Sequence, residues 1–366
     1  MNALSFPSDF LFGAATSAYQ IEGAHDADGK GPSIWDQFVQ QPGRIADGTT
    51  GQTACDHYRR YREDVALMAQ LNLQAYRFSI AWPRVMPEGE GRINERGLDF
   101  YSRLVDELLE QNIIPFATLY HWDLPAALER RGGWTQRDTA ARFADFAYQL
   151  GRRLADRVTH WITLNEPLAS AAMGYLYGLH APGHDAQLRN FLRASHNLNR
   201  AHGAACSALR AVDKDLVIGA AHVTSSIYPA SSRTPRFVVD IAHQFVNELF
   251  LMPQLRGEYP SFVGRLMRYL NPDFRSEDLA EIGPSLDFVG VNNYTRRVAR
   301  FAPNPLLPFS FVPPDPATAR TTDMGWEIFP RGIYDILKWL QDDFDNPTVY
   351  ITENGAEFED EPSKDG

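Results

Sequence analysis

The chain has 366 residues, of which 44% are hydrophobic and 22% are charged, a composition typical of a soluble globular protein with a large core. Its formal net charge of −11 argues against nucleic acids and anionic membrane surfaces as partners. Cys55 and Cys206 are too few for a disulfide scaffold, and no apolar run approaches the ~18 residues of a membrane helix.

The N-terminal residues do not resemble a secretory signal. Residues 1–10 lack a basic segment followed by an apolar one, which such a signal requires. Together with the low cysteine content, this favours a reducing cytoplasm as the location of the protein.

Short apolar or β-branched runs alternate with longer segments of helical period. The strand-like runs are residues 11–16, 75–82, 113–120, 159–165, 216–221, 286–292 and 348–353. The helix-like segments are residues 58–71, 97–111, 135–154, 191–212, 236–250 and 332–344. This order predicts a parallel sheet covered by helices. Because no glycine-rich phosphate loop follows the first strand, a (β/α)8 TIM barrel is favoured over a doubly wound sheet.

The number of strands is one short of a closed barrel, which needs eight. After the seventh strand the chain ends in the polar tail of residues 357–366. We therefore interpret residues 1–366 as a single (β/α) barrel domain, truncated before its eighth strand. Because unpaired strand edges favour aggregation, we expect the remaining βα unit to belong to a longer chain or to be supplied by another chain.

Two long irregular segments interrupt the alternation of strands and helices. Residues 36–54 are polar and rich in glycine, and residues 301–323 contain six prolines. Long loops within a compact domain commonly form the walls of functional sites. We expect both segments to rise from the face on which the strands end.

Two of the predicted strands end at a glutamate. Residues 159–165 lead directly into Glu166, and residues 348–353 end at Glu353, before an Asn-Gly pair that turns the chain. Because parallel strands end on one face of a barrel, both carboxylates can lie in one pocket. Glycoside hydrolysis needs such a pair, one protonated and one ionised. Asn165 adds an amide that can hold a sugar hydroxyl next to Glu166.

Several motifs resemble those of glycoside hydrolase family 1, the β-glucosidase family. They are Phe12-Gly13-Ala14-Ala15-Thr16-Ser17-Ala18-Tyr19-Gln20-Ile21-Glu22-Gly23, Tyr76-Arg77-Phe78-Ser79-Ile80-Ala81-Trp82-Pro83-Arg84, His121-Trp122-Asp123-Leu124-Pro125, Thr163-Leu164-Asn165-Glu166-Pro167, Val291-Asn292-Asn293-Tyr294 and Ile351-Thr352-Glu353-Asn354-Gly355. In the fifth motif Asn293 stands where tyrosine is usual. The resemblance extends over the whole chain, with the motifs in the order of the family.

The resemblance implies a role for each matching position. Glu166 would be the general acid/base and Glu353 the nucleophile of a retaining mechanism. The side chains expected to bind the sugar or to line the site are Gln20, His121, Trp122, Asn165, Asn292, Tyr294 and, at the aglycone entrance, Trp326. Arg77 and the hydroxyl of Tyr294 would tune the nucleophile, since a cation nearby keeps a carboxylate ionised.

Structural roles remain the alternative for some of these positions. His121, Trp122 and Trp326 can serve as packing residues, and Arg77 can form a structural ion pair. Glu22 is interpreted as stabilising its loop. The remaining histidines have no metal-ligand spacing and are assigned no site, and no metal or cofactor is expected.

The resemblance predicts a retaining β-glycosidase that removes terminal β-D-glucosyl residues from cellobiose-like or aryl β-glucosides. The alternatives are a 6-phospho-β-glycosidase and a truncated, non-catalytic sugar-binding remnant, since the strand expected to distinguish sugars is not in this chain. The expected partner is a small β-glucoside or oligosaccharide. A homo-oligomer and a complementing C-terminal segment are further partners left open.

Overall fold

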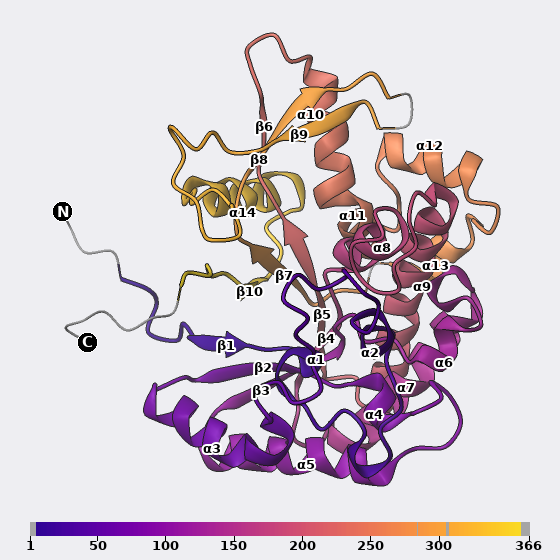
Figure 1. Ribbon diagram of the computed structural model, residues 1–366, viewed down its shortest axis with the longest axis vertical. Coiled ribbons are helices and arrows are strands. Elements are labelled where there is room, and N and C mark those ends of the chain that lie inside the picture. Colours follow the sequence, from indigo (N-terminus) through magenta and orange to yellow (C-terminus); the bar gives the residue numbers. More distant parts are fainter. Residues whose placement is uncertain (1–4, 284, 305–306, 360–366) are drawn as a thin grey trace.

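A computed structural model describes residues 5–283, 285–304 and 307–359 (Figure 1). Its main sheet consists of seven parallel strands: β1 (Gly13–Ala15), β2 (Ala75–Ser79), β3 (Ile114–Tyr120), β4 (His160–Asn165), β5 (Val217–Thr224), β7 (Phe288–Asn293) and β10 (Val349–Glu353). They are hydrogen-bonded in the order β1-β2-β3-β4-β5-β7-β10. All seven predicted strands are confirmed, with small shifts of their ends.

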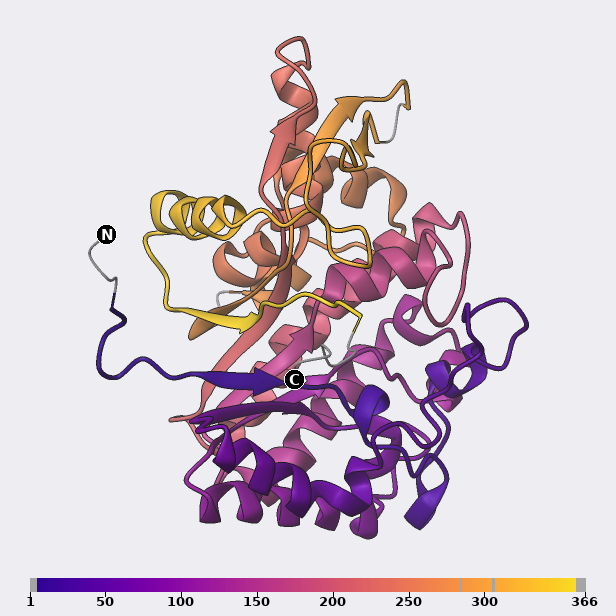
Figure 2. The same cartoon turned by 60° about the vertical axis from the view of Figure 1, so that its left-hand side comes forward.

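The sheet curves into a nearly closed barrel with helices on its outer side (Figures 1 and 2). β1 and β10 form the two ends of the sheet and contact each other. No backbone ladder joins these two strands in the part of the chain that the structure describes. The predicted α/β barrel is confirmed, and seven parallel strands build it.

Helices occupy most of the segments between the strands. They are α1 (Ala18–Ile21), α2 (Ile34–Phe38), α3 (His57–Gln70), α4 (Trp82–Val85), α5 (Glu95–Glu110), α6 (Ala126–Glu129), α7 (Asp138–Leu154), α8 (Pro167–Tyr175), α9 (Leu188–Val212), α10 (Arg236–His243), α11 (Leu249–Arg256), α12 (Ser261–Leu270), α13 (Asp278–Ile282) and α14 (Arg331–Asp343), with short 3₁₀ turns η1 (Ala27–Gly29) and η2 (Gly133–Thr135). Five of the six predicted helices are confirmed as α3, α5, α7, α9 and α14.

The sixth predicted helix, residues 236–250, is helical over its whole length, with a change of helix type that was not predicted. It is divided into α10 and α11 by the π-helical turn η3 (Gln244–Glu248). Within this turn the Asn247 amide accepts from the Ser225 N–H at 3.0 Å and donates to the Ser225 carbonyl at 2.9 Å. This pairing fixes Asn247 against the end of β5, and a local π turn accommodates it.

A second, small sheet lies beyond the barrel. It contains β6 (Ile227–Pro229), β8 (Arg297–Phe301) and β9 (Phe309–Val312), with β6 parallel and β9 antiparallel to β8. The prediction that residues 301–323 are irregular was therefore wrong in part, because the short apolar run between two prolines folds back on the preceding strand, β8. Of the other predicted irregular segment, residues 36–54, residues 36–38 belong to α2, and residues 39–54 contain no helix or strand.

The first irregular segment lies where it was expected, on the face at which the strands end. The Arg44 guanidinium donates to the carbonyl of Gly178 at 3.0 Å, in the loop that follows β4 and α8. None of the described helices is both long and apolar enough to cross a membrane.

Candidate active site

The two glutamates predicted as a pair lie at the C-terminal ends of two strands of the barrel. Glu353 is the last residue of β10, and Glu166 follows the last residue of β4. Arg77 on β2 and Asn292 on β7 point into the same end of the barrel, because their side chains contact these carboxylates. The parallel arrangement of the sheet thus brings side chains from four strands into one cluster.

Glu353 has two hydrogen-bond donors, one for each carboxylate oxygen. Arg77 forms an ion pair with Oε1 at 2.7 Å, and the hydroxyl of Tyr294 donates to Oε2. Burial, followed by the negative charge of Glu353, raises the pKa of Tyr294 well above its ordinary value, so this hydroxyl keeps its proton. Both contacts fix the orientation of the Glu353 carboxylate.

Glu166 lies in a different environment. Its residue is only 7% exposed, and its Oε1 accepts one hydrogen bond from the Asn292 amide at 2.9 Å. Burial, followed by the negative charge of Glu353, raises the pKa of Glu166 to about 7. Its backbone has a φ of 44°, in the left-handed region that non-glycine residues rarely adopt, directly before Pro167. Such strained backbone is common at functional sites.

Asn165 connects the surroundings of the two glutamates. Its side-chain oxygen accepts from Arg77 at 2.5 Å and from Asn292 at 3.0 Å, and its amide nitrogen contacts His121 Nε2 at 3.0 Å. The residue is 1% exposed. Most of its hydrogen-bonding capacity is therefore used inside the protein, and one amide hydrogen remains for a ligand.

The same contact defines the proton position on His121. Because Arg77 fixes the Asn165 oxygen, the Asn165 nitrogen donates to His121 Nε2, which leaves the ring proton on Nδ1. Burial, with a smaller effect of Arg77, lowers the pKa of His121 well below its ordinary value, so the ring is neutral. Its buried Nδ1 has no partner among the described residues. An unpaired buried donor beside two carboxyls is suited to a ligand hydroxyl.

Two of the predicted aromatic residues flank this cluster. Trp122, with a φ of 76°, donates its indole N–H to the Asn165 carbonyl at 2.9 Å. Trp326 packs with its ring 5.2 Å from that of Tyr294. Both side chains are half-buried, so each can present a face to a ligand.

Gln20 is the predicted site residue that the hydrogen-bond network does not include. It is exposed on α1, and its side-chain oxygen accepts from Ser17 at 2.7 Å. In the described part of the chain it makes no hydrogen bond to the two glutamates or to Asn165.

His180 and Arg297 are next to the site and were not predicted. The ring of His180 lies 5.4 Å from those of Trp122 and Trp35. Arg297 lies close enough to Glu166 that its positive charge lowers the pKa of that carboxyl, against the larger effect of burial. Both residues reach the site from loops or short strands outside the barrel, where hydrophobic periodicity carries no signal.

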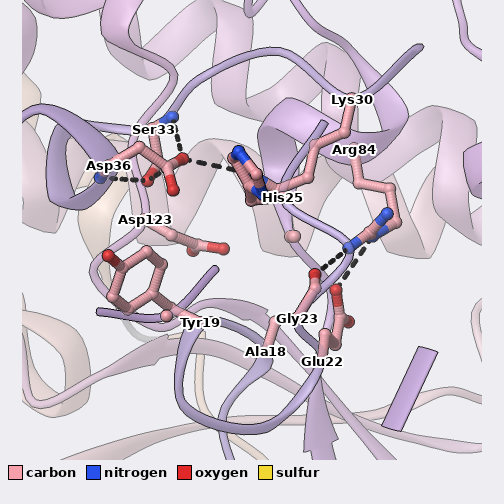
Figure 3. A pocket seen from close by; sticks show the side chains of 12 residues that line it. Ala18, Tyr19, Glu22, Gly23, His25, Lys30, Ser33, Asp36, Arg84 and Asp123 are labelled. Atoms are coloured by element: carbon pink, nitrogen blue, oxygen red, sulfur yellow. Dashed lines mark hydrogen bonds and ion pairs between the residues drawn. The ribbon is translucent and has the colours of Figure 1, made fainter. Parts of the chain in front are cut away.

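A second polar cluster lies around the loop that carries Asp123 (Figure 3). Arg84 is paired with Glu22 at 2.9 Å, and Lys30 with Asp36 at 3.1 Å. Tyr101 also donates to Glu22 at 2.6 Å, which confirms the interpretation of Glu22 as a stabilising residue.

The side chain of Asp123 lines the same small pocket as these ion pairs (Figure 3). Its Oδ1 is buried and has no partner among the described residues. Burial, followed by the charge of Glu22, raises the pKa of Asp123 to about 7. The cavity beside it measures about 10 Å³, enough for one water molecule at most. This cluster supports the loop of His121 and Trp122 and is too small to bind a sugar.

The arrangement suits acid–base and nucleophilic chemistry. One carboxylate is held by two donors, and the pKa of the other is raised to about 7. The described residues contain no group of three or more His, Cys, Asp or Glu side chains placed to hold a metal ion. A pair of carboxyls in such contrasting surroundings is the arrangement that glycoside hydrolysis requires.

Comparisons with known proteins agree with this arrangement. A sequence model of glycosyl hydrolase family 1 matches residues 2–365. Beta-glucosidase A of Thermotoga maritima is 48% identical over 372 aligned positions, which cover 100% of this chain and 82% of the relative. Beta-glucosidase A of Acetivibrio thermocellus is 43% identical, with coverage of 100% and 82%.

Solved structures give the same result. The Thermotoga maritima beta-glucosidase in complex with deoxynojirimycin superimposes with a TM-score of 0.93 and 48% identity, covering 99% of this chain and 81% of that one. The family 1 enzyme of the same organism in complex with isofagomine lactam gives a TM-score of 0.94.

Proposed function

The chain belongs to glycosyl hydrolase family 1, and from this we propose that it is a retaining β-glucosidase that removes terminal β-D-glucosyl residues from cellobiose-like or aryl β-glucosides. The observation that carries the proposal is the contrast between the two glutamates. Glu353 is paired with Arg77, whereas Glu166 is buried, with its pKa raised to about 7. A retaining glycosidase needs this difference between nucleophile and acid.

In the first step the Glu353 carboxylate attacks the anomeric carbon of the glucoside. The bond between this carbon and the leaving oxygen breaks, and Glu166 transfers its proton to that oxygen. The products are the free aglycone and a glucosyl ester of Glu353.

In the second step water attacks the same carbon and Glu166 accepts a proton from it. The ester bond breaks, which regenerates the Glu353 carboxylate and releases glucose with its original anomeric configuration. The unpaired Nδ1–H of His121 and the free amide hydrogen of Asn165 are the groups we propose to bind the sugar hydroxyls during both steps.

The aromatic side chains complete the proposed substrate site. We assign Trp122 to the wall of the glucose subsite, because its indole is fixed to the backbone of Asn165. Trp326 would line the aglycone entrance, as its ring packs on Tyr294. Gln20 remains a proposed sugar ligand on the basis of its motif alone.

Hydrolysis of an aryl β-glucoside by the purified protein tests the proposal. Glu353→Ala should abolish turnover while leaving the fold intact, and Glu359→Ala, which removes an exposed carboxylate from the same segment, should not affect turnover. Glu166→Ala should slow substrates with poor leaving groups far more than activated aryl glucosides, because the latter need little protonation.

The outcomes separate the alternatives. Turnover that persists in Glu353→Ala would contradict the assignment of the nucleophile. Equal losses on both kinds of leaving group would contradict the acid role of Glu166. Preference for a 6-phospho-β-glucoside would support that alternative, which the names of the relatives do not favour.

Location and assembly are part of the proposal. We infer a cytoplasmic location, because both Cys55 and Cys206 are free thiols. The ends of the sheet at β1 and β10 offer edges at which a second copy or a complementing segment can bind. Cell fractionation and light scattering of the purified protein test these two points.

A further inference from the structure

We propose that Arg297 is a specificity-determining residue, which selects β-glucosides whose aromatic aglycone carries a carboxylate. This inference rests on the proposed glucosidase activity and concerns the part of the substrate that leaves. It follows from three observations: the position of Arg297, its lack of a counterion and the side chains around it.

Arg297 is held in place by its backbone and by an aromatic ring. It is the first residue of β8, pairs with Ile227 of β6, and donates its N–H to the Ser226 carbonyl at 2.9 Å. Its guanidinium lies over the ring of Phe311 at 5.1 Å from the ring centre. The side chain is therefore directed by two neighbouring strands and does not move freely in solvent.

The guanidinium of Arg297 has no acidic partner. Among the described residues no carboxylate lies within ion-pair distance of it, and it makes no hydrogen bond. The other arginines nearby differ in this respect, since Arg296 is paired with both oxygens of Glu327 at 2.8 Å and Arg77 with Glu353. A desolvated cation is normally paired in a folded protein. Arg297 thus has unused capacity for an anion.

The direction toward the aglycone follows from Glu166. A general acid must lie within hydrogen-bond reach of the oxygen that leaves with the aglycone. Arg297 begins β8 only four residues after the end of β7 and three after Tyr294, whose hydroxyl contacts Glu353. It therefore stands over the strand ends that carry both carboxylates, where its charge also acts on Glu166, the acid that faces the leaving oxygen.

The remaining neighbours of Arg297 suit an aromatic ligand. Tyr177 is close enough for its phenol to interact with the charge of Arg297, and it is 46% exposed. Phe311 offers a second, half-buried ring. Flat rings and an unpaired guanidinium together match an aromatic ring that bears a carboxylate, which a guanidinium can bind through two hydrogen bonds.

The test compares two substrates that differ in charge, 3-carboxyphenyl β-glucoside and its methyl ester. The kcat/KM ratio of acid to ester is measured for the unaltered protein, Arg297→Gln, Arg297→Lys and the control Arg300→Gln. Arg300 lies on the same strand but is exposed, where it contacts Ser310. Differences in leaving-group quality between the substrates cancel when the ratio is compared across variants.

We expect Arg297→Gln to lower the acid-to-ester ratio about tenfold, the usual size of a lost hydrogen bond to a charged group. Arg297→Lys should retain part of the ratio, and Arg300→Gln all of it. An unchanged ratio in Arg297→Gln would overturn the inference. Equal losses on both substrates would also overturn it and would show instead that Arg297 acts through Glu166. If the unaltered protein hydrolyses neither substrate, the proposed glucosidase function itself fails.

Discussion

The proton on Glu166 should depend on the charge of Glu353, and the variant Glu353→Gln measures this dependence. Burial is the main cause of the raised pKa of Glu166, and the charge of Glu353 is the second. Glutamine keeps the size of the side chain and can still contact Arg77 and Tyr294. The substitution therefore removes one negative charge with little change in packing.

The size of the effect follows from Coulomb's law. At the separation of about 5 Å that retaining glycosidases use, and with an effective dielectric constant of about 20, two unit charges repel by about 3 kcal/mol. That energy corresponds to about 2 pH units and sets an upper limit, since burial contributes more than Glu353 does. We expect the pKa of Glu166 to fall from about 7 by about 1 to 2 pH units in Glu353→Gln.

Carbon-13 NMR of glutamate labelled at the side-chain carboxyl can follow this titration, with Glu166→Gln used to assign the signal. Glu359→Gln removes an exposed charge nearby and should leave the pKa of Glu166 unchanged. An unchanged or higher pKa in Glu353→Gln would refute the reasoning. A fall would explain how Glu166 changes from acid to base, because forming the glucosyl ester also removes the charge of Glu353.

Three further predictions test other contacts. Tyr294→Phe removes one hydrogen-bond donor to Glu353. It should lower kcat/KM about 10- to 100-fold, which is the effect of losing a hydrogen bond to a charged group. An unchanged kcat/KM would show that the hydroxyl is not needed. Asp123→Asn should raise the melting temperature more at pH 8 than at pH 5. The pKa of Asp123 is about 7 in the folded protein and 3.8 ordinarily, so the native protein loses stability as the pH rises between these values. Equal gains at both pH values would contradict this reasoning. Glu22→Ala leaves the fully buried Arg84 without its partner and should lower the unfolding free energy by about 3–5 kcal/mol in urea titrations, whereas a loss below about 1 kcal/mol would indicate a weak pair.

The barrel could be predicted because its strands are nearly continuous apolar runs. Each of the seven runs forms a strand, and the five inner ones are largely buried, which leaves the strongest local pattern. The small sheet of β6, β8 and β9 was not predicted, because β9 has only four residues between prolines and β6 pairs with β8, about 70 residues further along the chain. The π turn at residues 244–248 likewise depends on the contact of Asn247 with Ser225.

The candidate site shows the same division. Glu166, Glu353, Arg77 and Asn165 stand in motifs, and the structure joins them through hydrogen bonds. The motif of Asn165 could not show that most of its hydrogen bonds are made inside the protein. Those bonds depend on side chains that other parts of the barrel bring to it. Arg297 carries no local signal at all: its proximity to the site arises from the small sheet that the sequence did not reveal.

The ion pair between Arg77 and Glu353 also has a mechanical consequence. Arg77 belongs to β2 and Glu353 to β10, so this contact reaches past β1 and links the two sides of the unpaired seam. A further hydrogen bond from Arg77 to the Thr352 carbonyl, 3.3 Å long, acts in the same direction. Among the described residues β10 has a ladder on one side, with β7, and its Ile351 is 46% exposed. The Arg77–Glu353 pair therefore also anchors an end strand of the sheet, and in the proposed mechanism each turnover, which neutralises the Glu353 carboxylate, would briefly weaken the contact across the seam.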